Sequence, residues 1–275
     1  MSVARRPAEA DDRRGRFFLR AHSGLIYVFL YAPIAILVLF SFNRARQTAV
    51  WEGLTLDWYR ILLHDDLILS AVRNSLIVAA ACTFTATVFG TLAALALGRH
   101  EFPGKGMTRN LLYLPIIIPE IVVGAALVTF FGVIELRLSL WTVILAHVVF
   151  SISYVAIVVR ARLSGFDRSL EEAALDLGAR PLQTFWRVTL PLILPGIVAG
   201  ALLVFTISID DYVITSFVAG VGATTLPLQI YSMLKVGVTP EVNAVSTLLL
   251  ALTIGLIAAA QRLQQGPSER GEGTD

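Results

Sequence analysis

The run Ser75–Gly98 reads SLIVAAACTFTATVFGTLAALALG and contains no charged residue. A helix needs about 20 apolar residues to cross the hydrocarbon core of a bilayer, at roughly 1.5 Å of rise per residue. The run therefore has the length and the composition of one membrane-spanning helix. Strands of a membrane barrel would show shorter segments of alternating polarity instead. The sequence predicts an all-α integral membrane protein.

The composition of the whole chain agrees with this prediction. Of its 275 residues 56% are hydrophobic and 15% are charged, and the mean hydropathy is +0.74. An average soluble domain has about 25% charged residues, and a fold of this size cannot bury so much apolar surface. The single cysteine, Cys82, lies inside an apolar run, which excludes a scaffold held by disulfides.

Further apolar runs bring the number of predicted spans to six. The other five runs are Gly24–Phe42, Leu111–Phe131, Leu138–Val159, Leu192–Val218 and Val242–Gln261. The uncharged stretch Tyr212–Leu234 could be counted as a seventh span. Its middle, Ala219–Pro227, is rich in Gly and Thr and ends in Pro, which favours a turn followed by a short helix. We therefore predict six spans.

The distribution of basic residues predicts the orientation of the spans. With six spans, sixteen Lys and Arg residues fall on the side of both termini and six on the other side. Cytoplasmic connections carry the excess of positive charge, so both termini are expected in the cytoplasm. The chain then consists of a basic cytoplasmic tail (residues 1–23), a transmembrane domain (24–261) and a C-terminal cytoplasmic tail (262–275).

The longest cytoplasmic connection, residues 160–190, has the local signals of two short helices. Asp167 can cap the first helix, and Glu171 and Glu172 lie in its first turns, where the helix dipole favours acids. Gly178 can adopt the left-handed conformation that ends a helix, and Pro181 suits the start of the next one. We predict two helices joined by a tight turn beneath the membrane.

The first of these helices has an apolar face. Leu170, Ala173, Ala174 and Leu177 follow the spacing of one helical stripe. An apolar face in an otherwise polar connection indicates a protein partner. The alternative is a solvated amphipathic connector whose basic residues anchor the membrane interface.

The same connection carries a longer motif. The residues Glu172-Ala173-Ala174, Gly178, Val188 and Leu190-Pro191 stand at the spacing of the EAA signature, with Val188 where Ile is usual. The chain thus resembles the permeases of ABC importers. This resemblance implies a cytoplasmic coupling helix between the fourth and fifth spans that docks on an ATPase subunit. The residues then expected at the docking surface are Glu171, Glu172, Ala173, Ala174, Gly178 and Ala179.

Other motifs resemble one group within the ABC importer permeases. Three short motifs are similar to those of the type-I (MetI-like) permeases: Ser41–Asn43, Asn74–Leu76 and Phe102–Lys105. Those similar to the spermidine/putrescine permeases of the PotC type within that family are Phe205–Asp211, Leu226–Met233 and Gly237–Ala244. The resemblance implies a polyamine permease of the bacterial inner membrane. Its implied partners are a second permease subunit (PotB-like), two copies of an ATPase that uses ATP-Mg, and a periplasmic binding protein. It implies no cofactor on this chain and no nucleic-acid partner.

Acidic residues inside the predicted spans are candidates for a substrate pathway, because charge is costly at the centre of a bilayer. Glu120 lies near the middle of the third span, and Pro115 and Pro119 before it could bend or break that helix. Its carboxylate suits an ammonium group, as a pathway residue would require. Equally, it could pair with a basic side chain of a partner subunit.

Asp210, Asp211 and Tyr212 form a second candidate group, in the outer part of the fifth span. Adjacent helical residues point about 100° apart, so both aspartates cannot face one path squarely. One could line the entrance while the other caps the following helix, and Tyr212 could hold a cation on its ring. The alternative is a satisfied pair at the membrane interface.

The sequence lacks two kinds of motif, one for binding ATP and one for binding a metal ion. The chain has no motif with P-loop spacing, and its four His residues show no spacing typical of a metal site. His147, inside the fourth span, is expected to be a hydrogen-bonded packing residue. Energy must then come from another polypeptide or from an ion gradient.

Three hypotheses follow. The first is an ATP-driven permease for a polyamine or for another small solute. The second is an ion-coupled carrier that uses Glu120 and Asp210, and the third is a membrane enzyme, for which the sequence offers no clustered catalytic residues.

Overall fold

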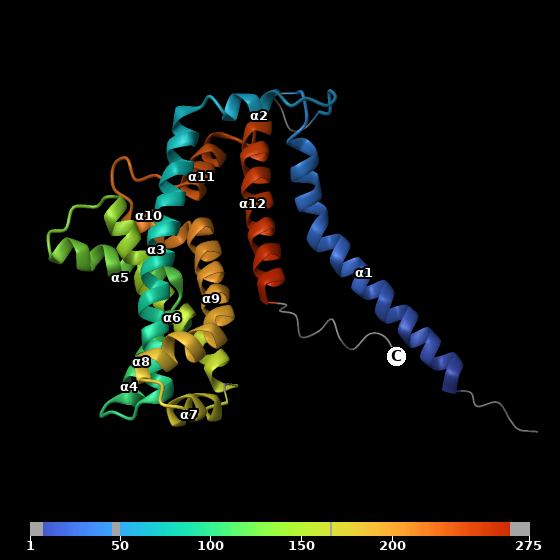
Figure 1. Ribbon diagram of the computed structural model, residues 1–275. Coiled ribbons are helices and arrows are strands. Elements are labelled where there is room, and N and C mark those ends of the chain that lie inside the picture. Colours follow the sequence, from blue (N-terminus) through green and yellow to red (C-terminus); the bar gives the residue numbers. More distant parts are fainter. Residues whose placement is uncertain (1–7, 46–49, 166, 265–275) are drawn as a thin grey trace, which may run out of the picture. The chain divides into compact units, whose positions relative to one another are not determined.

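The computed structural model describes residues 8–45, 50–165 and 167–264. In these ranges all regular elements are helices, apart from one isolated bridge between Asn43 and Leu54 (Figure 1). Parts of the predicted tails, residues 1–7 and 265–275, lie outside the described residues. The described part of the N-terminal tail belongs to α1 (Ala8–Phe40), which continues without a break into the first apolar run.

Five helical segments of the described chain are long and apolar enough to cross a membrane. They are Leu19–Phe40 of α1, α3 (Asp66–Arg99), α6 (Leu140–Ser164), the continuous stretch Pro181–Asp210, and Pro240–Ala258 of α12 (Pro240–Gln264). A sixth span results when the bent pair α4 (Lys105–Ile117) and α5 (Glu120–Val133) is counted as one. The prediction of an all-α membrane protein is confirmed.

The third predicted span, Leu111–Phe131, is not a straight helix. Its two halves, α4 and α5, meet at an angle of 108°. The break falls at Ile118, whose ψ of 132° is extended, and Pro119 is the residue before α5. A residue before proline disfavours the helical conformation, which explains why the helix stops there. The predicted break at the prolines is therefore confirmed.

The fifth predicted span ends earlier than the sequence indicated. Helix α9 (Leu190–Asp210) stops at Asp210 rather than near Val218, and two short helices follow it, α10 (Val213–Val218) and α11 (Leu226–Val236). The turn and short helix expected in Tyr212–Leu234 are confirmed, and this stretch does not form a seventh span.

The chain divides into two compact units. One comprises Met1–Leu62, as far as it is described, with Gly237–Leu248. Its connection from α1 to α2 (Asp57–Leu62) folds around Asn43, whose amide donates to Val50 O (2.6 Å) and accepts from Glu52 N (3.0 Å). Trp58 Nε1 donates to the carbonyl of Asn43 (2.8 Å). The Ser41–Asn43 motif thus holds this connection together.

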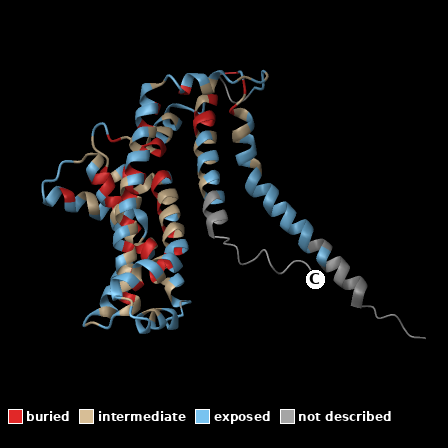
Figure 2. Ribbon diagram, viewed as in Figure 1, coloured by how far each residue is buried: buried red, intermediate tan, exposed pale blue. Residues whose placement is uncertain are grey.

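The second unit, Leu63–Val236 with the described part of Leu249–Asp275, has its core where α3, α6 and α9 pack on one another. Buried positions gather on these helices in Figure 2. Small side chains such as Ala86 and Ala94 of α3 allow close approach to Val155 and Val159 of α6. A second apolar cluster joins α5, α6 and α10, with Phe131, Phe150 and Ile214 among its buried members.

The first turns of α3 are fastened to the connection between α10 and α11. Asn74 Nδ2 donates to the carbonyls of Gly222 and Thr224, both at 3.0 Å. Ser75 Oγ accepts from the backbone N–H of Leu226 at 2.8 Å. The Asn74-Ser75 pair therefore fixes the start of α11 against α3, and α3 itself begins at Asp66, before the apolar run.

Candidate functional site

The connection between α6 and α9 contains the predicted pair of short helices. They are α7 (Ser169–Asp176) and α8 (Pro181–Thr184), and a π-helical turn, η1 (Phe185–Thr189), leads on into α9. Gly178 has φ +86°, the left-handed conformation expected after a helix, and Ala179 N–H donates to Ala174 O (3.1 Å). Pro181 is the first residue of α8, as predicted.

The sequence predicts Asp167 as the capping residue directly before the first short helix, but it lies one position earlier. The residue before the helix is Arg168, and Asp167 lies one position earlier. Its Oδ1 accepts from the backbone N–H of Ser169 at 2.9 Å, the first residue of α7. The hydrogen bonds from the backbone and hydroxyl of Ser169 hold the pKa of this carboxyl below its ordinary value.

The apolar face of α7 is open. Leu177 is 89% exposed, and Leu170, Glu172 and Ala173 are exposed beside it, while Ala174 and Ala179 are half-buried. Next to it, α8 and η1 present a surface pocket of about 390 Å³. The pocket is lined by Arg180, Leu182, Gln183, Trp186 and Arg187. This end of the molecule combines exposed apolar side chains with basic ones, as a protein-docking surface does.

Glu171 differs from the other predicted docking residues because it faces this chain. It forms an ion pair with Arg99, the last residue of α3, and accepts a hydrogen bond from the Thr189 hydroxyl. Only 19% of its side chain is exposed. The sequence placed Glu171 and Glu172 on the same helix but gave no sign that Glu171 would find a basic partner 72 residues earlier in the chain.

The candidate acids of the pathway fall into two kinds. Glu120 is the first residue of α5 and Asp210 the last of α9, and both are exposed. Neither forms a hydrogen bond or an ion pair within the part of the chain that the structure describes. Asp211, by contrast, is 5% exposed and is fully engaged.

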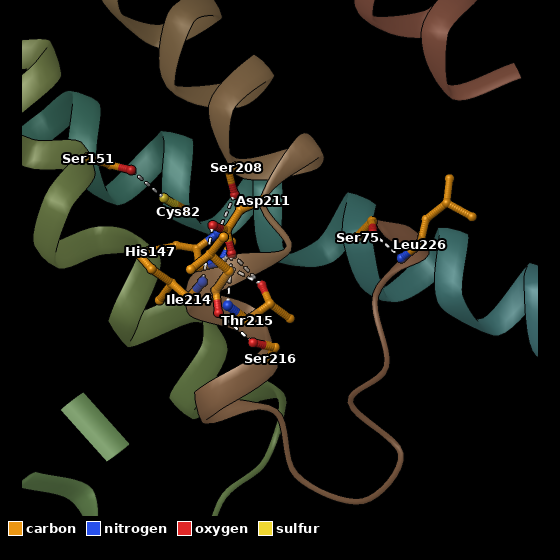
Figure 3. A network of polar contacts seen from close by, with 11 residues as sticks. Ser75, Cys82, His147, Ser151, Ser208, Asp211, Ile214, Thr215, Ser216 and Leu226 are labelled. Carbon is orange, nitrogen blue, oxygen red and sulfur yellow. Dashed lines mark hydrogen bonds and ion pairs between the residues drawn. The ribbon is translucent and has the colours of Figure 1, made fainter. Parts of the chain in front are cut away.

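Asp211 belongs to a buried polar network that joins α6, α9 and α10 (Figure 3). Its Oδ2 accepts from the backbone N–H and from the hydroxyl of Thr215, both at 2.8 Å, and lies 3.2 Å from His147 Nε2. His147 is fully buried, and its ring nitrogens also contact Ser208 Oγ (2.8 Å) and Thr215 Oγ1 (3.0 Å). Asp211 thus caps α10, and His147 is hydrogen-bonded as predicted.

Replacing Asp211 by Ala should destabilise this region. The change leaves the backbone N–H of Thr215 without its acceptor in a dry site, at a cost of about 1–3 kcal/mol, and it removes the carboxylate from the contact between the Thr215 hydroxyl and His147. We expect a lower melting temperature for the purified protein and faster hydrogen exchange in α10. Asp66→Ala, at an exposed position in α3, is the control. Equal stability of the two variants would contradict the structural role of Asp211.

Tyr212 lies in an aromatic pair that already holds an ammonium group. Its ring and that of Tyr231 in α11 have centroids 4.4 Å apart. The Lys235 Nζ atom lies 4.8 Å from the centroid of Tyr231. A primary ammonium at this distance from an aromatic ring is attracted by its negative face. In the described residues no group of three or more His, Cys, Asp or Glu could hold a metal ion.

Comparisons with known proteins agree on one class. Residues 86–266 match the model of the family described as binding-protein-dependent transport system inner membrane component. The spermidine/putrescine transport system permease protein PotC of Haemophilus influenzae is 42% identical over 90% of this chain and 96% of its own length. The putrescine transport system permease protein PotI of Escherichia coli K12 is 44% identical over 84% of this chain and 86% of its own.

A solved structure has the same fold. A chain of a bacterial ABC transporter involved in the import of the acidic polysaccharide alginate superposes with a TM-score of 0.73, at 17% sequence identity. The match covers 95% of this chain and 99% of that one. At this identity the likeness concerns the fold alone.

Proposed function

Since the chain belongs to the family of binding-protein-dependent transport system inner membrane components and is a permease subunit of an ABC importer, we propose that its substrate is a polyamine. The observation that carries this proposal is an exposed carboxylate without a partner in the described residues, two positions before a tyrosine whose aromatic pair already holds a primary ammonium. Asp210 supplies the carboxylate, and Tyr212 with Tyr231 supplies the rings. A polyamine is a chain of protonated amines joined by methylene groups. Carboxylates bind its ends, and rings bind both its cations and its methylenes.

The acids have distinct roles in this proposal. Asp210 receives an ammonium group at the outer end of α9, while the buried Asp211 fixes α10 and thereby holds Tyr212 in place. Glu120 provides a second carboxylate at the bend between α4 and α5, where the chain is broken as in transporter helices that line a cavity.

The driving force comes from a separate ATPase that docks on α7. The exposed Leu170, Glu172, Ala173 and Leu177 form the contact surface, with Ala174, Gly178 and Ala179 setting its shape. Two ATPase copies, a second and different permease subunit (PotB-like) and a periplasmic binding protein complete the importer, and ATP-Mg is used by the ATPase. With both termini cytoplasmic, the docking surface lies on the side where ATP is available. Nucleotide states of the ATPase then shift the inward and outward states by differential affinity.

A reconstituted importer tests this function. The permease pair and the ATPase are placed in proteoliposomes, and uptake of labelled spermidine and putrescine is measured with binding protein supplied outside and ATP inside. We expect uptake that stops without the ATPase and survives an uncoupler. Uptake without the ATPase that collapses with an uncoupler would instead establish the ion-coupled carrier. ATP-driven uptake of an uncharged solute in preference to a polyamine would contradict the proposed substrate.

Gly178→Val should weaken the hold of the ATPase on the permease. A side chain in the left-handed conformation costs about 1–2 kcal/mol, which corresponds to roughly a five- to thirtyfold loss of affinity if the turn must keep its shape on docking. Gly165→Val is the matched control, because Gly165 is in the same connection, also has open space around its Cα, and has an ordinary φ of −94°. The measurement is ATPase retained on the tagged permease. Equal retention by both variants would contradict the role of the turn.

A further inference from the structure

Three helical elements meet at the carboxylate of Glu171. Glu171 belongs to α7, Arg99 is the last residue of α3, and Thr189 is the last residue of η1, directly before α9. The Arg99 guanidinium and the Thr189 hydroxyl both donate to Glu171 Oε1. Arg99 Nη2 also lies 3.5 Å from Thr189 Oγ1, which closes the triangle. We call Arg99, Glu171 and Thr189 the junction.

A second bond runs parallel to the junction. The Arg168 guanidinium, at the residue before α7, donates to the carbonyl of Gly98 at 3.1 Å. The end of α3 therefore contacts the first turn of α7 twice, through Arg99 and through Gly98. Glu172 of the same helix and Leu177, the residue directly after it, take no part in these bonds and are exposed.

The side chains of the junction are largely shielded from water. The side chains of Arg99 and Glu171 are 25% and 19% exposed, and Thr189 is fully buried. The ion pair between Lys105 and Glu101 lies close to it in the sequence, but the Glu101 side chain is 90% exposed. Exposed pairs contribute little, whereas removing one partner of a shielded pair leaves the other charge uncompensated. The two pairs thus provide a test and its control in one chain.

The elements that the junction connects pack as one body. Helices α3 and α9 pack on each other and on α6, so a displacement imposed on the end of one is shared by the others. Packed helices transmit movement because their interior has little free volume. A force applied to the outer face of α7 reaches this body through the inner face, where Glu171 is held.

We propose that the junction transmits the movement of the docked ATPase from α7 to α3 and α9. This inference rests on the proposed function, because it requires that an ATPase docks on α7. In this proposal Glu171 transmits the movement, and Glu172 and its exposed neighbours bind the ATPase. Arg99, Glu171 and Thr189 are positioning residues, and none of them contacts the substrate.

The test separates docking from transmission. In the reconstituted importer, three quantities are measured for Arg99→Glu, Glu171→Arg and the double exchange: ATPase retained on the permease, ATP hydrolysed, and polyamine taken up. We expect each single variant to retain the ATPase and to hydrolyse ATP, with the ATP used per polyamine raised about tenfold, a size typical of coupling between contacting charges. The double exchange restores an ion pair of opposite charges and should bring the ATP used per polyamine most of the way back to the wild-type value.

Two further variants make the outcome decisive. Exchanging Glu101 and Lys105 in the same way should leave the ratio of ATP to polyamine unchanged. Thr189→Val keeps the side-chain shape but removes the hydroxyl that donates to Glu171 and accepts from Arg99, so it should raise the ratio by about threefold. If Arg99→Glu and Glu171→Arg keep the wild-type ratio, or if the double exchange is no better than either single change, the proposal is wrong. Loss of ATPase retention in the single variants would also overturn it, since Glu171 would then belong to docking. Failure of the wild-type importer to take up polyamine refutes the proposed function instead.

Discussion

Replacing Asp210 by Asn is expected to lower polyamine uptake about ten- to a hundredfold. A hydrogen bond to a charged group contributes about 1.5–3 kcal/mol, and each 1.4 kcal/mol corresponds to a factor of ten. Asp210 is exposed and has no bond to lose inside the described chain, so the variant should fold and assemble normally. The loss should therefore appear in transport and not in stability.

Uptake by whole cells, with the amount of permease in the membrane measured in parallel, checks this expectation. Asp211→Asn serves as the contrast, because it disturbs a buried network and should reduce the amount of folded permease. Asp66→Asn removes an exposed charge elsewhere and should change neither quantity. Normal polyamine uptake by Asp210→Asn would reduce this acid to a structural or interfacial residue.

Gly220→Ala is expected to destabilise the folded permease strongly. A Cβ at this position would lie 1.9 Å from the carbonyl oxygen of Leu138 and 2.7 Å from the backbone nitrogen of Ser139. Both atoms are backbone, so no side chain can turn aside, and either the start of α6 or the connection after α10 must move. Such overpacking costs about 3 kcal/mol, the upper end of the usual range.

The yield and the melting temperature of the purified permease measure this effect. Gly132→Ala is the matched control, because Gly132 lies in helix α5 with open space around its Cα. Alanine in a helix is favoured over glycine by about 0.5–1 kcal/mol, so that variant should be as stable as the wild type or slightly more so. If Gly220→Ala melts like Gly132→Ala, the close approach is not present in solution.

Local signals predicted the local structure well. Proline before a break explained the bend at Pro119, a glycine after a helix gave the left-handed turn at Gly178, and a proline at the first helical position gave α8. Each of these features depends on the backbone preferences of one or two residues. The same holds for Ala219–Pro227, where glycine and proline interrupt an uncharged stretch that hydropathy alone would have counted as a span.

Features that depend on contacts between distant segments could not be predicted in the same way. Asp210 and Asp211 are adjacent and chemically identical, yet one is exposed and the other caps α10 beside His147. The end of α9 at Asp210 separates them, and hydropathy gave no sign of that end. Likewise, the apolar stripe of α7 predicted a face that contacts a partner. The sequence did not predict that another face of α7 is held to α3, because this depends on the ion pair between Glu171 and the distant Arg99.

The most direct test of the account is a cross-link from α7 to the ATPase in the working importer. The chain has one cysteine, Cys82, which is buried, so a cysteine introduced at the exposed Ala173 can be labelled selectively with a photoactivatable group. A cysteine at Ser70, near the opposite end of α3 from Arg99, is the control. We predict that the importer labelled at Ala173 forms a cross-link to the ATPase and that the one labelled at Ser70 does not. An assembled, transporting complex in which Ala173 fails to cross-link to the ATPase would contradict the claim that α7 receives the driving force.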